Sequence, residues 1–263
     1  MIYHIDKINL PKQVFQAISL VENLFPKKIL GIYLYGSATL GGLYPNSDID
    51  ILIITSKKIN NKTRTELTKQ LMAISGKVGC IEKRPLEVTI INQKDIISWQ
   101  LPLKCEYMYG EWLRKEMEAG KIPQPFYDAD LTILLWQARV SNIQLRGEQA
   151  EKLIPLISSD DVQKAIQDSL PILLSNIKND ETNILLTLSR MWFTLETGQI
   201  CSKNTAAEWI LPKLPSQLTP LMELAVAEYL GKCTAEWNDL EKEVFLLIDF
   251  IESKLKNILE CSY

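Results

Sequence analysis

Apolar positions in the first half of the chain alternate between helical and strand-like spacing. In residues 11–26 they recur at helical intervals between two prolines. The helical face expected there consists of Val14, Phe15, Ile18, Val21 and Phe25. Continuous apolar runs in 28–37, 48–55 and 84–92 predict buried strands, and the pattern of 63–76 predicts another helix. The first half is therefore expected to mix strands and helices.

Helical spacing dominates the second half. Ser158 and Asp161 have the spacing of a capping box that opens a helix, and Gly198 is placed to end a later one. Helices are predicted in residues 158–177, 181–198, 202–211, 218–231 and 241–258. The change of pattern predicts two domains, residues 1–155 and 156–263.

Composition and aromatic positions agree with a folded globular protein. The chain has 263 residues, 46% of them hydrophobic and 23% charged, which is enough for one large domain or two modest ones. Trp136, Trp192 and Trp209 stand at helical apolar spacing, and we expect them in the core.

Charge, apolar runs and cysteines exclude several classes of protein. The net charge is −3 and no basic block occurs, so a nucleic-acid partner is not expected, whereas a cationic small molecule would suit the mild acidic excess. The N-terminus lacks a secretory-signal pattern, and no apolar run approaches the roughly 18 residues of a membrane span. The five cysteines include no CxxC pair, which indicates reduced thiols in a cytoplasmic protein.

The chain has a single histidine, His4, near the N-terminus. A Ser-His-Asp or Cys-His nucleophile site and a histidine-rich metal site are therefore excluded. Any catalysis must depend on carboxylates, lysine, arginine, tyrosine or serine.

Three acidic residues interrupt the predicted strands. Side chains alternate between the faces of a strand, so Asp48 and Asp50 share one face while their isoleucine neighbours enter the core. Glu87 interrupts the strand in 84–92 in the same way. Two carboxylates on the same face of a strand, two residues apart, repel each other unless a cation lies between them. Ligand sets made only of oxygen atoms suit Mg²⁺. The three groups could therefore share a divalent metal site.

A Gly-Ser pair follows the first strand. Gly36 and Ser37 open a turn whose exposed N–H groups and hydroxyl could cradle a phosphate. Neither GxxxxGK[ST] nor GxGxxG occurs, which excludes a P-loop and a dinucleotide fingerprint. Each feature alone has an ordinary explanation: a turn, a solvated strand end or a surface glutamate.

In combination these features are more specific. Gly-Ser, then Asp-x-Asp within a strand, then a carboxylate on a later strand resembles the nucleotidyltransferase superfamily with its polymerase-β-like palm. The segments LYGSATLGGLYPNSDIDILI, KRPLEVTIIN, YGEWLR, ILLTLSRMWFTLETGQICSKNTAAEW and AEYLG extend the match over about residues 28–240. They resemble the aminoglycoside adenylyltransferases that modify spectinomycin and, in one branch, also streptomycin.

This resemblance implies an α+β fold. An N-terminal polymerase-β-like nucleotidyltransferase domain, a mixed sheet with helices, would precede an all-α helical bundle. The implied reaction joins AMP from ATP to a drug hydroxyl and releases pyrophosphate. Asp48 and Asp50 would hold two Mg²⁺ ions, and Glu87 would be the general base and a further metal ligand. Gly36, Ser37 and Ser47 match positions that meet the triphosphate and the metal.

The resemblance also assigns roles outside the palm. Arg190, Lys203 and Tyr229 match nucleotide-contacting positions, and Arg and Lys suit triphosphate charge. Trp112 and Asp180 match drug-contacting positions. Without the resemblance, Arg190 and Lys203 would be interpreted as solvated surface charges, Trp112 as a core aromatic and Asp180 as a helix N-cap.

Several functions remain open at this level. The enzyme could instead be a dual spectinomycin and streptomycin adenylyltransferase, or a nucleotidyltransferase of another substrate. A nucleotide-sensing or toxin–antitoxin module is a non-enzymatic alternative, although such a binder would not need all three carboxylates.

The dual branch carries a tryptophan and an aspartate before the helical domain's DE motif. Here Leu173 and Leu174 occupy the aromatic's place, and no acid lies between Asp168 and Asp180. We therefore expect an enzyme that is specific for spectinomycin. We also expect it to be a monomer.

Overall fold

The computed structural model describes residues 10–45, 47–77, 80, 82–175 and 177–260. His4 lies outside the described residues. The chain divides into two compact units, residues 1–157 and 158–263. This division falls later than the boundary predicted after residue 155. The reason is local packing, because Ile154 is buried in a hydrophobic cluster of the first unit and Ile157 packs against it.

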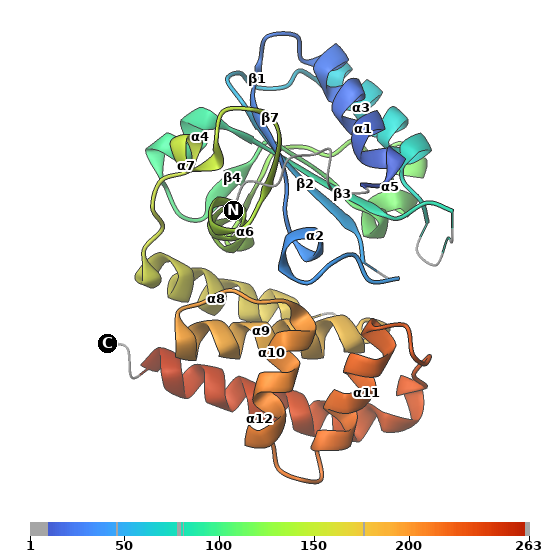
Figure 1. Ribbon diagram of the computed structural model, residues 1–263, viewed down its shortest axis with the longest axis vertical. Helices are drawn as coiled ribbons and strands as arrows, with labels where there is room; N and C mark the ends of the chain where they lie inside the picture. The colour runs from blue at the N-terminus through green and yellow to red at the C-terminus, as the bar shows by residue number, and fades with distance from the viewer. Residues whose placement is uncertain (1–9, 46, 78–79, 81, 176, 261–263) are drawn as a thin grey trace. The chain divides into compact units, whose positions relative to one another are not determined.

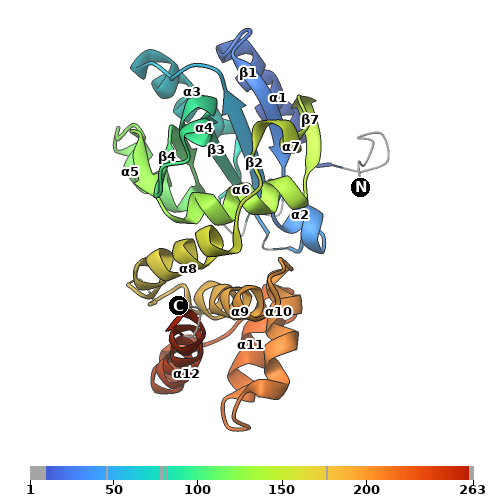
Figure 2. The same cartoon turned by 90° about the vertical axis from the view of Figure 1, so that its left-hand side faces the viewer.

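The first unit contains a mixed sheet with helices on both faces (Figures 1 and 2). The strand order is β5-β3-β2-β1-β7; β2 and β3 are parallel and the other pairs are antiparallel. The strands are β1 Ile29–Leu34, β2 Ile49–Thr55, β3 Leu86–Asn92, β5 Tyr107–Tyr109 and β7 Ile143–Gly147. A separate two-stranded sheet pairs β4 Leu103–Cys105 with β6 Phe126–Asp128. The predicted mixed sheet is confirmed.

Two hydrophobic clusters hold helices against this sheet. One lies under α1 Lys12–Leu24 and α3 Asn61–Ile74, which run side by side in Figure 1. The other lies under α6 Asp130–Val140 on the opposite face. Short helices complete the unit: α2 Ser37–Leu40, α4 Gln93–Ser98, η2 Glu111–Leu113, α5 Arg114–Glu118 and α7 Ala150–Leu153. The sheet therefore has a helical layer on each face.

One predicted core residue of α1 is exposed. Val14, Ile18, Val21 and Phe25 are buried as expected, but Phe15 is 43% exposed. The prediction for Phe15 was wrong because consecutive helical residues lie about 100° apart, so the neighbour of a buried Val14 turns away from the core.

The second unit is all-α, as predicted. Its helices are α8 Ser159–Leu174, α9 Glu181–Thr197, α10 Lys203–Ile210, α11 Thr219–Tyr229 and α12 Glu241–Glu260, with short turns η3 Leu211–Lys213 and η4 Trp237–Leu240. The central helix is α9, which contacts all four of the others. The predicted start of α8 is confirmed, since the Ser158 side chain accepts a hydrogen bond from Asp161 N at 3.0 Å.

The three tryptophans differ in burial. Trp192 is 2% exposed, in the core of the second unit as predicted. Trp136 and Trp209 are only partly buried. Lys213 places its Nζ 3.3 Å from the Trp209 ring centroid, so a charged group packs on this ring. Among the described residues, no helix combines the length and the apolar character needed to cross a bilayer.

A buried ion pair ties α3 to the segment between β4 and β5. The Arg64 guanidinium bonds both the carboxylate and the main-chain oxygen of Glu106, and Ile59 N donates to the same carboxylate at 2.8 Å. Both charged side chains are almost completely shielded from solvent. Removing one partner would leave the other charge buried without compensation.

We expect Glu106→Ala to lower the free energy of unfolding by about 3–5 kcal/mol, the usual cost of breaking a buried pair. Glu116→Ala is the matched control, because it breaks an exposed pair with Lys121 and should cost less than about 1 kcal/mol. Urea unfolding of both variants measures the difference. Equal, small effects would show that the buried pair contributes no more than a surface one.

Candidate active site

Two of the three predicted carboxylates are neighbours across parallel strands. In the pairing of β2 with β3, Asp50 is directly opposite Glu87. Ile49 and Ile51 on β2 point into the core, with 0% and 1% exposure, so the half-buried Asp50 points to the other face. Asp48 precedes β2 by one residue and is also half-buried. The strand register thus places Asp50 beside Glu87, and Asp48 lies two residues before Asp50.

The Gly-Ser turn lies against the same aspartate. A Cβ atom on Gly36 would lie 1.8 Å from Oδ2 of Asp50, and the φ of Gly36 is +67°. Only glycine therefore fits there, for reasons of space and of backbone conformation. A main-chain hydrogen bond also connects the residue before Gly36 to Asp50, since Tyr35 N donates to the Asp50 carbonyl at 3.1 Å. The two motifs, separated in sequence, form one site.

The two serines at this site have different surroundings. The hydroxyl of Ser37 is shielded from solvent and has no hydrogen-bond partner within the described chain. A buried hydroxyl without a partner fits a ligand that would supply one. Ser47 is 5% exposed, and its Oγ accepts a hydrogen bond from Tyr44 N at 3.1 Å, so part of its bonding capacity is used within its own loop.

Burial and like charges raise the pKa of Glu87 to about 8. Desolvation is the largest cause, followed by the negative charges of Asp50 and Asp48. The hydroxyl of Tyr35 donates to Glu87 Oε1 at 3.2 Å and acts in the opposite direction. The pKa of Tyr35 itself is raised, first by burial and then by Glu87 and Asp50, so this hydroxyl keeps its proton.

The chemistry of these side chains suits a hard divalent cation. No three His, Cys, Asp or Glu side chains within the described ranges already stand in the arrangement of a metal cluster. The negative charges of Asp50 and Asp48 nevertheless disfavour the ionised form of Glu87, and carboxylate oxygens are the ligands that Mg²⁺ prefers. The donor set fits such an ion because a cation would remove that repulsion.

Trp112 is held on the surface of the first unit. Its side chain is 57% exposed, so it is not the core aromatic of the ordinary interpretation. The ring covers Gly110, where a Cβ would lie 2.3 Å from a ring atom. Glu111 accepts hydrogen bonds from Arg114 Nη2 at 2.8 Å and from Tyr109 OH at 2.6 Å, which fixes the turn that presents the indole.

In the second unit, Asn183 joins two of the predicted residues. Asp180 stands at the N-cap position of α9, but its side chain makes no capping bond to the main chain. Its Oδ2 instead accepts a hydrogen bond from Asn183 Nδ2 at 2.8 Å, and Asn183 Oδ1 accepts one from Lys203 Nζ. A predicted drug contact and a predicted nucleotide contact are thus linked through one amide.

The other predicted nucleotide contacts lie on α9 and α11 and are partly exposed. The charge of Arg190 lowers the pKa of Cys201, although burial dominates and raises it to about 11, so the guanidinium lies near that thiol. Tyr229 is the last residue of α11 and follows Glu228, whose carboxylate accepts hydrogen bonds from Trp237 Nε1 at 2.9 Å and Ala235 N at 2.8 Å. These bonds fix the chain after α11.

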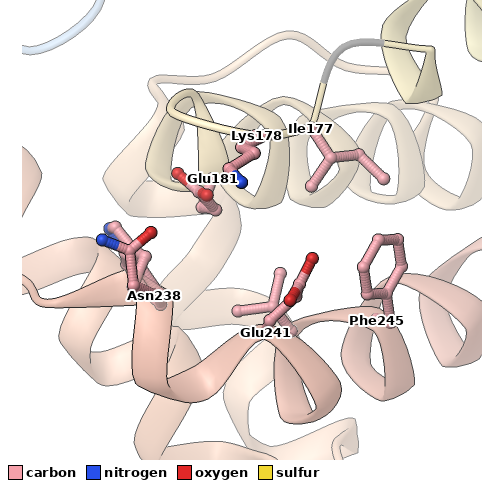
Figure 3. Close-up of a pocket in the computed structure, with 8 residues that line it drawn as sticks. Ile177, Lys178, Glu181, Asn238, Glu241 and Phe245 are labelled. Carbon is pink, nitrogen blue, oxygen red and sulfur yellow. The ribbon is translucent and has the colours of Figure 1, made fainter.

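A small pocket of about 50 Å³ lies elsewhere in the second unit. Figure 3 shows Lys178 from the turn before α9 and Glu181 from the start of α9 opposite Glu241 and Phe245 from the start of α12. None of the predicted site residues lines it.

Known families match most of the chain. Residues 18–101 match the family described as polymerase beta, nucleotidyltransferase, and residues 152–254 match the aminoglycoside adenylyltransferase C-terminal domain. The first range includes Asp48, Asp50 and Glu87, and the second includes Asp180, Arg190, Lys203 and Tyr229.

Individual relatives are similar over almost their whole length. A spectinomycin 9-adenylyltransferase from Campylobacter jejuni is 55% identical over 95% of this chain and 96% of its own. An aminoglycoside (3'')(9) adenylyltransferase from Klebsiella pneumoniae is 37% identical over 84% and 85%.

The fold agrees with a solved structure as well. The crystal structure of an Enterococcus spectinomycin adenyltransferase with ATP and spectinomycin superimposes with a TM-score of 0.89 at 36% identity, covering 93% of this chain and 98% of that one. The chain therefore belongs to the aminoglycoside adenylyltransferase family, among relatives of the spectinomycin 9-adenylyltransferase type.

Proposed function

We propose that this protein transfers AMP from ATP to the 9-hydroxyl of spectinomycin and releases pyrophosphate. The observation that carries this proposal is the joint site of the first unit, in which Asp50 touches Gly36 and pairs in register with Glu87. Likeness to a spectinomycin 9-adenylyltransferase over 95% of the chain supplies the substrate. The product would be an adenylylated drug, so the biological role would be antibiotic resistance.

Glu87 is the proposed general base. As the drug oxygen bonds to the α-phosphorus of ATP, the bond from that phosphorus to the leaving pyrophosphate oxygen breaks, and the drug's hydroxyl proton passes to Glu87. A base must be ionised to accept a proton, yet the pKa of Glu87 is about 8 when its neighbours carry uncompensated charge. Tyr35 supports the ionised form by donating to Oε1.

Asp48 and Asp50 are the proposed ligands of two Mg²⁺ ions, with Glu87 as a further ligand. When bound, the ions would stabilise the charge on the attacking and leaving oxygens. Gly36, Ser37 and Ser47 are the proposed triphosphate contacts. The unpaired hydroxyl of Ser37 supports this assignment.

Trp112 of the first unit and four residues of the helical unit are proposed to complete recognition of both substrates. Arg190, Lys203 and Tyr229 would contact the nucleotide, with two positive charges for the triphosphate. Trp112 and Asp180 would contact the drug, whose amines suit a carboxylate and an aromatic face. Their exposure leaves these two side chains accessible to a ligand.

The second candidate is a dual spectinomycin and streptomycin enzyme, which a 37% identical relative's name suggests. The segment 168–182 argues against it. Leu173 and Leu174 end α8 where the dual branch would carry an aromatic, and Asp180 is the first acid after Asp168. Streptomycin's guanidinium groups would lack a carboxylate and a stacking surface there.

Expressing the chain in a susceptible bacterium should therefore give strong growth on spectinomycin and none on streptomycin. Pyrophosphate release by the purified protein with ATP, Mg²⁺ and each drug is the direct measurement. Strong streptomycin resistance would contradict the interpretation of segment 168–182. Absence of turnover with either drug, together with ATP binding, would favour the sensor or toxin–antitoxin alternative.

The setting of the reaction is also a proposal. A cytoplasmic location is supported by the need for ATP and by the free thiols of the four described cysteines, and the lack of a nucleic-acid partner by the net charge of −3. A monomer is proposed as well. Sedimentation of the purified protein would test the monomer.

A further inference from the structure

One guanidinium group holds the loop that leads into β2. The side chain of Arg84 donates hydrogen bonds to main-chain oxygens of this loop: Leu43 at 3.3 Å, Ser47 at 3.2 Å, a longer one to Pro45 at 3.4 Å, and one to Tyr44. We call Leu43–Pro45 and Ser47 the clasped loop. All these acceptors are backbone carbonyls, so the clasp fixes the path of the chain whatever its side chains do.

The main chain of Arg84 is itself anchored. The Gln13 side chain, 6% exposed on α1, accepts from Arg84 N at 2.8 Å and donates to Arg84 O at 2.7 Å. Gly76 N, after α3, donates to the same oxygen at 2.9 Å. The guanidinium therefore extends from a fixed point just before β3, three residues ahead of Glu87.

Two further hydrogen bonds join residues within the clasped loop. Within it, Tyr44 N donates to Ser47 Oγ at 3.1 Å and Ser47 N donates to Tyr44 O at 3.0 Å. Beyond it, Ile49 N donates to Pro85 O at 2.9 Å, where β2 begins its pairing with β3. Asp48 therefore lies between two hydrogen-bonded residues, Ser47 and Ile49. Only a planar guanidinium has enough donors in a fixed fork to bond several carbonyls at once.

We propose that Arg84 is a positioning residue for nucleotide binding. It holds the clasped loop so that Ser47 and Asp48 keep their place relative to Glu87 on the next strand. This inference rests on the proposed function, because the loop's task would be to meet the metal and the triphosphate. Arg84 acts through the loop and touches no reacting atom.

Steady-state kinetics and backbone hydrogen exchange of Arg84→Ala and Arg84→Lys test the proposal. We expect kcat/KM for ATP to fall by about 10–100-fold in Arg84→Ala, since small misplacements at a site have effects of that order. The decrease in kcat/KM for ATP should be smaller in Arg84→Lys. The KM for spectinomycin should stay near the wild-type value in both. In the absence of Mg²⁺ and ATP, backbone amides in a peptide spanning residues 41–48 should exchange faster in both variants than in the wild type.

Arg146→Ala is the matched control, because Arg146 is a half-exposed arginine of the same unit that pairs with Glu22 at 3.0 Å. It should change neither kinetics nor exchange. Unchanged ATP kinetics and loop exchange in the Arg84 variants would overturn the proposal. So would a parallel rise of both KM values with the loss of thermal stability. If Arg84→Ala does not fold, Arg84→Lys decides by the same criteria. If wild type releases no pyrophosphate, the proposed function fails, while the exchange data still decide whether the clasp exists.

Discussion

Asp50→Asn should abolish AMP transfer while leaving the protein folded. Asparagine has nearly the same shape as aspartate, so it preserves the close contact with Gly36 and the carbonyl that accepts from Tyr35 N. It removes the charge that is proposed to hold Mg²⁺. Such an ion contributes several kcal/mol of charge stabilisation at the transition state, so turnover should fall by about 10³-fold or more.

Pyrophosphate release with saturating ATP, Mg²⁺ and spectinomycin measures this loss. Thermal unfolding with and without Mg²⁺ and ATP gives a second reading, because the ligand-induced stabilisation of the wild type should shrink in the variant. Asp160→Asn is the control, since it makes the same chemical change on an exposed carboxylate of α8. Near-normal turnover by a folded Asp50→Asn enzyme would refute the metal assignment.

Long, strongly patterned elements were predictable from the sequence. The strands around Asp50 and Glu87 are continuous apolar runs, and the five helices of the second unit repeat apolar residues at helical spacing. The apolar pattern predicts no bounded element between residues 93 and 154. Strands β4, β5 and β6 of this segment have three residues each, too few for any periodicity to develop. They form because tertiary pairing, such as that of β5 with β3, stabilises them.

The core of the site was predictable because alternation in a strand places side chains without knowledge of tertiary contacts. Tyr35 was missed, since an aromatic at the end of an apolar run looks like any core residue. Asn183 was missed as well, although it lies three residues after Asp180 and therefore on the same helical face. The partners of Arg84 are backbone carbonyls, which leave no trace in the residue types of the loop.

Glu87→Gln should slow the chemical step by about 10²–10⁴-fold, the usual contribution of a general base. The amide oxygen of glutamine can still accept from the Tyr35 hydroxyl, so the side chain should keep its place. Binding of ATP with Mg²⁺ should survive, which calorimetry can measure. Glu148→Gln, an exposed glutamate of the same unit, is the control. Loss of ATP binding would make Glu87 chiefly a metal ligand instead of a base.

The same variant has an expected signature in the pH dependence of stability. Without metal, the pKa of Glu87 is raised from 4.5 to about 8, so between these values the folded protein keeps a proton that the unfolded chain has released. Glu87 therefore makes the free energy of unfolding fall as pH rises through this window. Urea unfolding in a chelating buffer at about pH 6 and about pH 8.5 should show this fall in wild type and a smaller one in Glu87→Gln. Identical pH slopes in the two proteins would mean that Glu87 ionises normally, and that burial beside Asp50 and Asp48 does not hold its proton.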